Sequence, residues 1–165
     1  MTAGIDAIVK EVLAVLGTGG QVSPFAARPA GLTLAEAYRV SAGLDRRRTA
    51  RGEKRLGRKI GFTNRTIWQQ YGVYAPIWGY VYDSTMFDLE QTPALPLYGF
   101  AEPRIEPEIV FGLAAAPAPG MDEAALLAPA STGWRMVSRS CSRSFRAGSL
   151  RQRIRLPPTV CMERC

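Results

Sequence analysis

Glu106 and Glu108 stand two residues apart in the segment Arg104–Phe111, with Pro107 between them. The apolar residues around them predict a β-strand, whose alternation puts both glutamates on one face. Their Cα atoms would be about 6 to 7 Å apart, so both carboxylates can converge on a hard cation such as Mg²⁺ or Mn²⁺. Alternating acids are also typical of a solvated outer face. Pro107 cannot donate to a neighbouring strand, which predicts a sheet edge or a bulge.

The composition limits the other chemistry that the chain can perform. It contains no histidine, so a Ser-His or Cys-His nucleophile system is excluded, and acid–base work falls to Lys, Asp, Glu, Tyr or metal-bound water. The three cysteines, Cys141, Cys161 and Cys165, all lie near the C-terminus. Without a partner histidine, they argue against both a zinc site and a disulfide framework.

The net charge of +7 is concentrated at the end of the chain. Residues 1–129 balance 13 Lys and Arg against 13 Asp and Glu, whereas residues 130–165 hold eight Arg and one acid, Glu163. A non-catalytic basic protein that binds nucleic acid through this tail is therefore an alternative to an enzyme. Only the tail supports that alternative, and we do not expect nucleic acid as a partner. Removing residues 130–165 would distinguish the binding protein from the enzyme. A nucleic-acid-binding protein should lose its affinity, whereas an enzyme should lose no function.

Residues 1–56 are expected to form an N-terminal helical segment. Apolar residues recur at helical spacing from Ile5 to Leu16. A second helix is predicted to begin at Thr33, which forms a capping box with Glu36, and to end in the basic run Arg46–Arg48. No segment indicates a membrane span or a signal peptide, so we expect a cytoplasmic protein without a membrane partner.

Residues 57–129 are expected to form a β-rich domain, because short β-branched and aromatic runs alternate with Gly and Pro. A loop is expected at Ala114–Gly120 and a short helix at Met121–Ala128. The predicted strands are Lys59–Thr63, Gly79–Tyr82, Leu95–Phe100 and Arg104–Leu113.

Three motifs follow one another in this domain: GRKIGFT at Gly57–Thr63, YGV with PIWG at Tyr71–Gly79, and PRIEPEI at Pro103–Ile109. Together they resemble the 2-keto-4-pentenoate hydratases and related oxalocrotonate decarboxylases of the fumarylacetoacetate hydrolase superfamily. The resemblance implies an α+β fold, with N-terminal helices against part of a mixed β-roll of the fumarylacetoacetase C-terminal-domain type. It also implies a hydratase that adds water to 2-hydroxypenta-2,4-dienoate in aromatic catabolism, or alternatively a 2-keto acid decarboxylase.

The resemblance further implies roles for individual residues. Glu106 and Glu108 become ligands of Mg²⁺ or Mn²⁺, with a third glutamate further along the chain. Lys59 becomes an active-site residue that shuttles a proton or holds the substrate carboxylate. Without the family context, Lys59 could equally be an ordinary surface lysine. The implied partner is a small 2-keto or 2-hydroxy-dienoic acid, and the full-length family implies a homo-oligomer.

The sequence departs from the family pattern at Ile77, where hydratases of this group often have an acid. Asp83 is the nearest acid along the chain and is our candidate for that catalytic role. An Asp at the end of a strand is, however, more often a turn former.

Residues 130–165 are interpreted as a disordered, Arg- and Ser-rich tail, which leaves the β-roll incomplete. The abrupt change of composition suggests a frameshift. A frame that takes the last base of one codon and the first two of the next can read an apolar, histidine-containing string here, with a glutamate straddling Ser138 and Arg139. We therefore predict that residues from about Ala130 onward are out of frame and that a third metal ligand was lost there, so that this chain should bind metal weakly.

Overall fold

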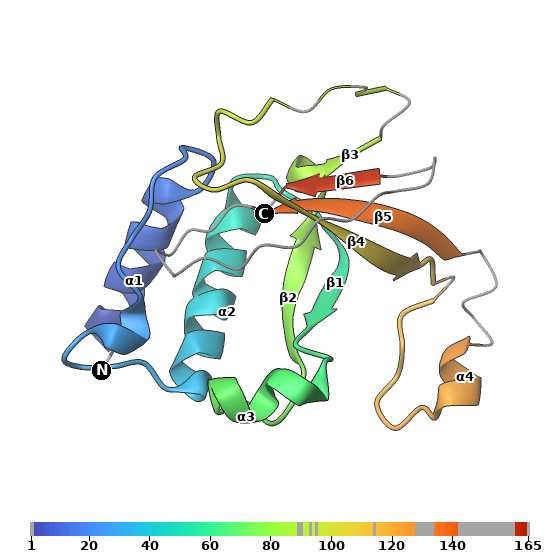
Figure 1. Cartoon of the computed structure of the whole chain (residues 1–165), viewed down its shortest axis with the longest axis horizontal. Helices are drawn as coiled ribbons and strands as arrows, with labels where there is room; N and C mark the ends of the chain where they lie inside the picture. Colours follow the sequence, from blue (N-terminus) through green and yellow to red (C-terminus); the bar gives the residue numbers. More distant parts are fainter. Residues whose placement is uncertain are drawn as a thin grey trace.

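The computed structural model describes residues 2–88, 91–92, 94, 96–113, 115–127, 134–141 and 161–164. Helix α1 (Thr2–Val15) lies beside helix α2 (Leu34–Ala50), and α2 separates α1 from the strands (Figure 1). The strands form a two-stranded sheet and a four-stranded sheet. The chain therefore has the α+β class that its sequence predicts.

The two long helices are joined by a close apolar crossing. The Val9 side chain is only 1% exposed, and a Cβ atom at Gly43 would lie 2.7 Å from Val9 Cγ2. Glycine at this position therefore lets α1 approach α2 closely. The start of α2 is capped as predicted: the Glu36 N–H donates to Thr33 Oγ1 at 3.3 Å, and the Thr33 N–H donates to Glu36 Oε2 at 3.0 Å.

Strands β1 (Arg55–Gly61) and β2 (Ile77–Tyr82) form an antiparallel pair with a bulge between Arg55 and Gly57. The 3₁₀ helix η2 (Arg65–Ile67) and the short helix α3 (Trp68–Tyr71) connect them. The Trp78 ring of β2 stacks on Tyr38 of α2, with ring centroids 5.6 Å apart. This contact attaches one face of the pair to α2 and leaves the other face towards the second sheet.

The second sheet has the strand order β3-β6-β5-β4. β4 pairs antiparallel with β5 and lies at the edge, as Pro107 predicted, while β5 pairs parallel with β6. Helix α4 (Glu123–Leu127) follows β4, and the 3₁₀ helices η1 and η3 span Phe25–Ala27 and Asp83–Thr85. The strands are β3 (Met86–Phe87), β4 (Arg104–Phe111), β5 (Trp134–Cys141) and β6 (Cys161–Arg164).

Two sequence expectations require correction. The strand expected at Leu95–Phe100 is not formed by its described residues 96–100, which include a turn, because Pro96 lacks an N–H and Gly99 weakens an extended segment. The tail expected to be disordered contains the strands β5 and β6. Backbone pairing explains this difference, since the open edge of β4 can pair with a strand whatever its side-chain pattern.

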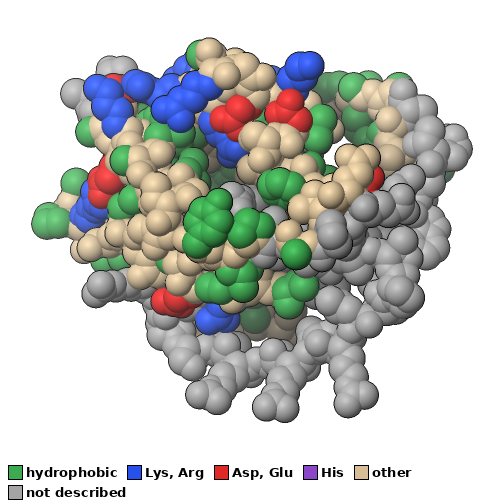
Figure 2. Space-filling model, turned by 90° about the horizontal axis from the view of Figure 1, so that it is seen from above, with side chains coloured by type: hydrophobic (Ala, Val, Ile, Leu, Met, Phe, Trp, Pro, Cys, Tyr) green, Lys and Arg blue, Asp and Glu red, His purple; other side chains and the backbone are tan. Residues whose placement is uncertain are grey.

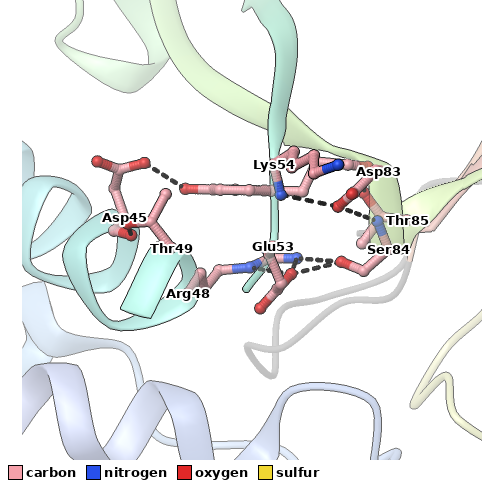
Figure 3. A network of polar contacts seen from close by, with 9 residues as sticks. Asp45, Arg48, Thr49, Glu53, Lys54, Asp83, Ser84 and Thr85 are labelled. Carbon is pink, nitrogen blue, oxygen red and sulfur yellow. Dashed lines mark hydrogen bonds and ion pairs between the residues drawn. The ribbon is translucent and has the colours of Figure 1, made fainter. Parts of the chain in front are cut away.

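A polar network around the buried Asp45 attaches the start of β1 to α2, and Figure 3 shows the Asp45 and Arg48 side chains that α2 contributes to it. Asp45 of α2 is only 5% exposed, and both its oxygens accept from the Arg55 guanidinium, at 2.7 and 2.6 Å. Tyr82 also donates its hydroxyl to Asp45, at 3.0 Å, and the Arg48 guanidinium lies 3.8 Å from the centre of the Tyr82 ring. The network holds β1 on α2 four residues before Lys59.

Hydrophobic side chains lie open in the middle of one face of the molecule, with Lys and Arg gathered along one margin of that face (Figure 2). Several large apolar residues are exposed, among them Leu56, Ile60, Ile109 and Phe111. Within the described part of the chain, no helix is long and apolar enough to cross a membrane.

Candidate functional site

Lys59 of β1 and Glu108 of β4 form an ion pair between segments that lie 49 residues apart in the sequence. The Lys59 amine donates to Oε1 of Glu108. Both side chains are largely covered, with 22% and 28% of their surfaces exposed. The pair therefore joins the β1–β2 sheet to the edge strand of the second sheet.

The orientation of β4 distinguishes a cation site from a solvated outer face, the two interpretations of its acidic residues. Glu108 is half-buried against β1, whereas Ile105 and Ile109, on the alternate face, are 49% and 65% exposed. A solvated acidic face would show the reverse pattern, with covered isoleucines and open carboxylates. Glu108 therefore lies on the inner face of its strand, within reach of a basic residue.

An open cavity of about 530 Å³ lies beside the ion pair. Its volume is in the range of small-molecule sites. Glu108 lines the cavity and is the acidic residue among the described residues of its lining. The remaining lining comes from the end of β1 with the residues after it, Lys59–Thr63, and from the start of β2, Ile77–Gly79.

Glycines surround Lys59 on its own face of the β1–β2 sheet. Gly57 and Gly61 lie two residues before and after it, and Gly79 is its cross-strand partner. Among the described residues, a Cβ atom at Gly57 or Gly79 would meet nothing within 4 Å, and one at Gly61 would only touch Ile77, at 4.0 Å. The surface beside the amine is therefore bare and roomy, although glycine weakens a strand interior.

Phe62 lines the cavity and has a left-handed conformation, with φ of 61°. This conformation is unfavourable for a residue with a side chain, and strained positions of this kind cluster at functional sites. Two contacts hold it there. The Trp68 indole N–H donates to the Phe62 carbonyl at 2.8 Å, and the Tyr71 ring meets the Phe62 ring edge-on, with centroids 5.4 Å apart.

Glu106 lies two residues before Glu108 in β4, so strand alternation puts both positions on one face. The Glu106 side chain lies outside the described part of the structure. Among the described residues, no group of three or more His, Cys, Asp or Glu could hold a metal ion. Carboxylate oxygens at this face suit Mg²⁺ or Mn²⁺ in kind, but the described donors are fewer than such a site ordinarily uses.

The structure does not bring Asp83 to this cavity. Its Oδ1 accepts from the backbone N–H of Lys54 at 2.9 Å and of Ser84 at 2.8 Å (Figure 3). These bonds tie the end of β2 to the residue before β1, at the far end of the strand pair from Gly79. This geometry is the turn-forming alternative, in which the carboxylate satisfies backbone donors.

Sequence reasoning named Lys59 and Glu108 separately but did not anticipate their pairing. It also missed Phe62, although Phe62 lies within the GRKIGFT motif. A positive φ at a phenylalanine leaves no signal in residue type, because glycine and asparagine are the residues that normally mark such positions.

Comparison with known proteins supports the motif resemblance. No family model matches the chain. It is 33% identical over 91 residues to the 2-hydroxypent-2,4-dienoate hydratase of Pseudomonas putida, an alignment that covers 54% of this chain and 40% of the hydratase. It is 34% identical over 92 residues to a 4-oxalocrotonate decarboxylase of a Pseudomonas species, which covers 56% of this chain and 35% of that enzyme. The alignments thus span less than half the length of either relative.

A solved structure agrees with these relatives. The 4-oxalocrotonate decarboxylase from Pseudomonas putida G7, complexed with magnesium and adipate, superposes with a TM-score of 0.63 at 25% identity. The match covers 78% of this chain and 49% of the decarboxylase. The resemblance predicted from the motifs is therefore confirmed: over about half of its length the chain is related to the 2-keto-4-pentenoate hydratases and oxalocrotonate decarboxylases.

Proposed function

We propose that this chain carries part of the active site of a divalent-metal-dependent lyase, of the hydratase type that adds water to 2-hydroxypenta-2,4-dienoate. One observation carries the proposal: Lys59 and Glu108 meet on inward faces of two different sheets beside an open cavity. A purely structural ion pair would need no cavity, whereas a cavity with a few convergent polar groups is the usual setting of a small-molecule site.

The residues around the cavity suit a small acidic substrate with a flat carbon chain. Glu108 and Glu106 would hold the divalent cation, since their carboxylates supply hard oxygen donors. When bound, the cation supplies Lewis acidity that stabilises an enolate next to the 2-oxo group. The Lys59 amine would carry a proton at the neighbouring carbon or hold the substrate carboxylate. The bare surface at Gly61 and Gly79 leaves room for a planar dienoate.

The second candidate is a decarboxylase of the oxalocrotonate type. The structural neighbour with a TM-score of 0.63 is such an enzyme, which favours this alternative in fold but not in any one residue. The Lewis acidity of a bound cation would assist either reaction, so the site residues proposed above would serve both. Release of CO₂ from oxalocrotonate would identify the decarboxylase, and loss of the diene absorbance of hydroxypentadienoate would identify the hydratase.

The β4–β5 register supports the proposal that residues from about Ala130 onward are out of frame. Ser138 pairs with Pro107, and Arg139 pairs with Glu106. The glutamate that the alternative frame can encode across Ser138 and Arg139 would face the Glu-x-Glu pair from the position of Arg139, the cross-strand partner of Glu106. We further propose that both sheets form part of a mixed β-roll, and that the complete protein is a homo-oligomer.

The test compares this chain with a frame-corrected chain, each assayed with Mg²⁺ or Mn²⁺ on 2-hydroxypenta-2,4-dienoate. We expect strong turnover by the corrected chain and little or none by this one. Lys59→Met and Glu108→Gln in the corrected chain should each abolish turnover, whereas Asp83→Asn should retain it, because Asp83 binds backbone N–H groups away from the cavity. If neither chain transforms hydroxypentadienoate or oxalocrotonate, the proposed function is wrong.

A further inference from the structure

The Lys59 amine binds the Glu108 carboxylate, which the proposed function assigns as a ligand of a metal ion. It donates to Oε1 of Glu108, and Lys59 and Glu108 both line the cavity. The Lys59 ammonium takes the place of a metal ion here, since its single positive charge neutralises the carboxylate without any metal. The two cations cannot share the site freely, because an ammonium and a divalent ion at contact distance from one carboxylate repel each other strongly.

The surface beside Lys59 has room for the amine to adopt a second position, away from Glu108. Its cross-strand partner is Gly79 and the next residue on its face is Gly61, and a Cβ at Gly79 would meet nothing within 4 Å among the described residues. No side chain of these two neighbours therefore blocks a swing of the four-carbon lysine stem across the strand pair. The opposite face is different, because Trp78 packs there on Tyr38.

We infer that Lys59 and the divalent cation exchange on Glu108, so that metal binding releases the Lys59 amine into the cavity. This inference rests on the proposed function and adds an order of events to it. In the metal-free chain, Lys59 holds the Glu108 carboxylate and is covered. In the metal-loaded chain, the amine is free to meet an anionic substrate. Metal binding would therefore precede productive substrate binding.

The exchange can be followed without measuring turnover, because the chain contains only three lysines, Lys10, Lys54 and Lys59. Brief treatment with acetic anhydride, followed by peptide mass spectrometry, reports the accessibility of each amine. Addition of Mg²⁺ should raise acetylation of Lys59 several-fold relative to the other two, since only Lys59 is paired with a proposed metal ligand. Unchanged or reduced Lys59 acetylation in the metal-loaded chain would overturn the exchange.

Mn²⁺ affinity, measured by electron paramagnetic resonance, gives a second and independent readout. Lys59→Met should bind Mn²⁺ about tenfold more tightly than the unmodified chain, because Glu108 no longer carries a competing cation. Lys54→Met is the matched control: it removes the same charge from the segment leading into β1 but leaves the Glu108 pair intact, so its affinity should be nearly unchanged. Equal affinities of the two variants would contradict the exchange.

The outcomes also separate this inference from the proposed function. If Glu108→Gln loses Mn²⁺ while Lys59→Met binds it no better than Lys54→Met does, the metal site stands and the exchange is wrong. If the unmodified chain, Lys59→Met and the frame-corrected chain all fail to bind Mn²⁺, both the metal site and the exchange are wrong.

Discussion

Replacing Asp45 with asparagine is expected to loosen the attachment of β1 to helix α2. Asp45 is 5% exposed and accepts three hydrogen bonds, two from the Arg55 guanidinium and one from the Tyr82 hydroxyl. Asparagine has nearly the same shape but lacks the charge. Its carbonyl can replace one acceptor oxygen, while its amide group presents donors to an arginine that also only donates.

The size of the effect follows from the burial of each partner. Hydrogen bonds to charged groups contribute about 1.5 to 3 kcal/mol each, but the Arg55 side chain is 49% exposed and water can replace part of what it loses. We therefore expect Asp45→Asn to lower the free energy of unfolding by about 2 kcal/mol, less than the 3 to 5 kcal/mol typical of a fully buried broken pair. Thermal unfolding followed by circular dichroism should show a fall of roughly 4 to 8 °C in Tm.

The dependence of this difference on pH tests its electrostatic origin. Burial alone would raise the pKa of the Asp45 carboxyl, but hydrogen bonds from Arg55 and Tyr82 outweigh burial and lower that pKa below its ordinary value. A carboxyl with a lowered folded pKa stabilises the fold above its unfolded pKa, and this contribution disappears as the pH falls through the folded value. The gap between the unmodified chain and Asp45→Asn should therefore be full at neutral pH and shrink below about pH 4.

Asp6→Asn provides the matched control, because Asp6 also pairs with an arginine, Arg47, but its side chain is 48% exposed. Surface ion pairs of this kind contribute little. Its Tm should therefore remain close to that of the unmodified chain. Equal destabilisation by Asp6→Asn and Asp45→Asn, or a gap that does not change with pH, would refute the reasoning.

Three further predictions use the same unfolding assay, and the one for Gly79 also uses turnover. Burial, with the hydrogen bond to Asp45, raises the pKa of Tyr82 to about 12. Tyr82 should therefore stabilise the folded state below pH 10, and this contribution should disappear as the pH rises to about 12. The Tyr82→Phe variant should not show this loss of stability at high pH. Gly79→Ala should stabilise the chain by about 0.5 to 1 kcal/mol but obstruct a planar dienoate beside Lys59, and unchanged turnover in the frame-corrected chain would contradict this. Gly43→Ala should destabilise by about 1 to 3 kcal/mol because its Cβ would lie 2.7 Å from Val9 Cγ2, and a gain in stability would contradict that packing.

Local signals in the sequence predicted the helices and the strand that carries the acidic pair. Thr33 and Glu36 form the capping box that was expected, and Pro107 marks an edge strand as expected. The strand prediction at Leu95–Phe100 was wrong, because the apolar residues of this segment suggest a strand while Pro96 and Gly99 oppose one. Strand β5 was not predicted because its pairing depends on the edge of β4, which lies far away in the sequence.

Part of the candidate site could likewise be predicted from local sequence, and part depends on long-range contacts. The face of β4 that carries the glutamates follows from strand alternation alone. Which face points inward does not follow, because alternation is equally consistent with acids inside or outside. Only the arrangement of the β1–β2 pair against β4 decides it, by placing the Lys59 amine at Glu108. A single sequence carries no signal for that contact.

The pairing of β4 with β5 confines the missing part of the proposed metal site to very few positions. Val137 and Arg139 of β5 are the cross-strand partners of Glu108 and Glu106. Cross-strand partners lie on the same face of a sheet, about 4.5 to 5.5 Å apart at Cβ, so these are the β5 positions from which an oxygen ligand would reach the pair. Neither valine nor arginine can supply an oxygen, although the backbone register would suit one. On the proposed function, the deficit lies in residue identity on β5 and not in the geometry of β1 and β4, so correction of the reading frame should strengthen metal binding without rebuilding the cavity around Lys59.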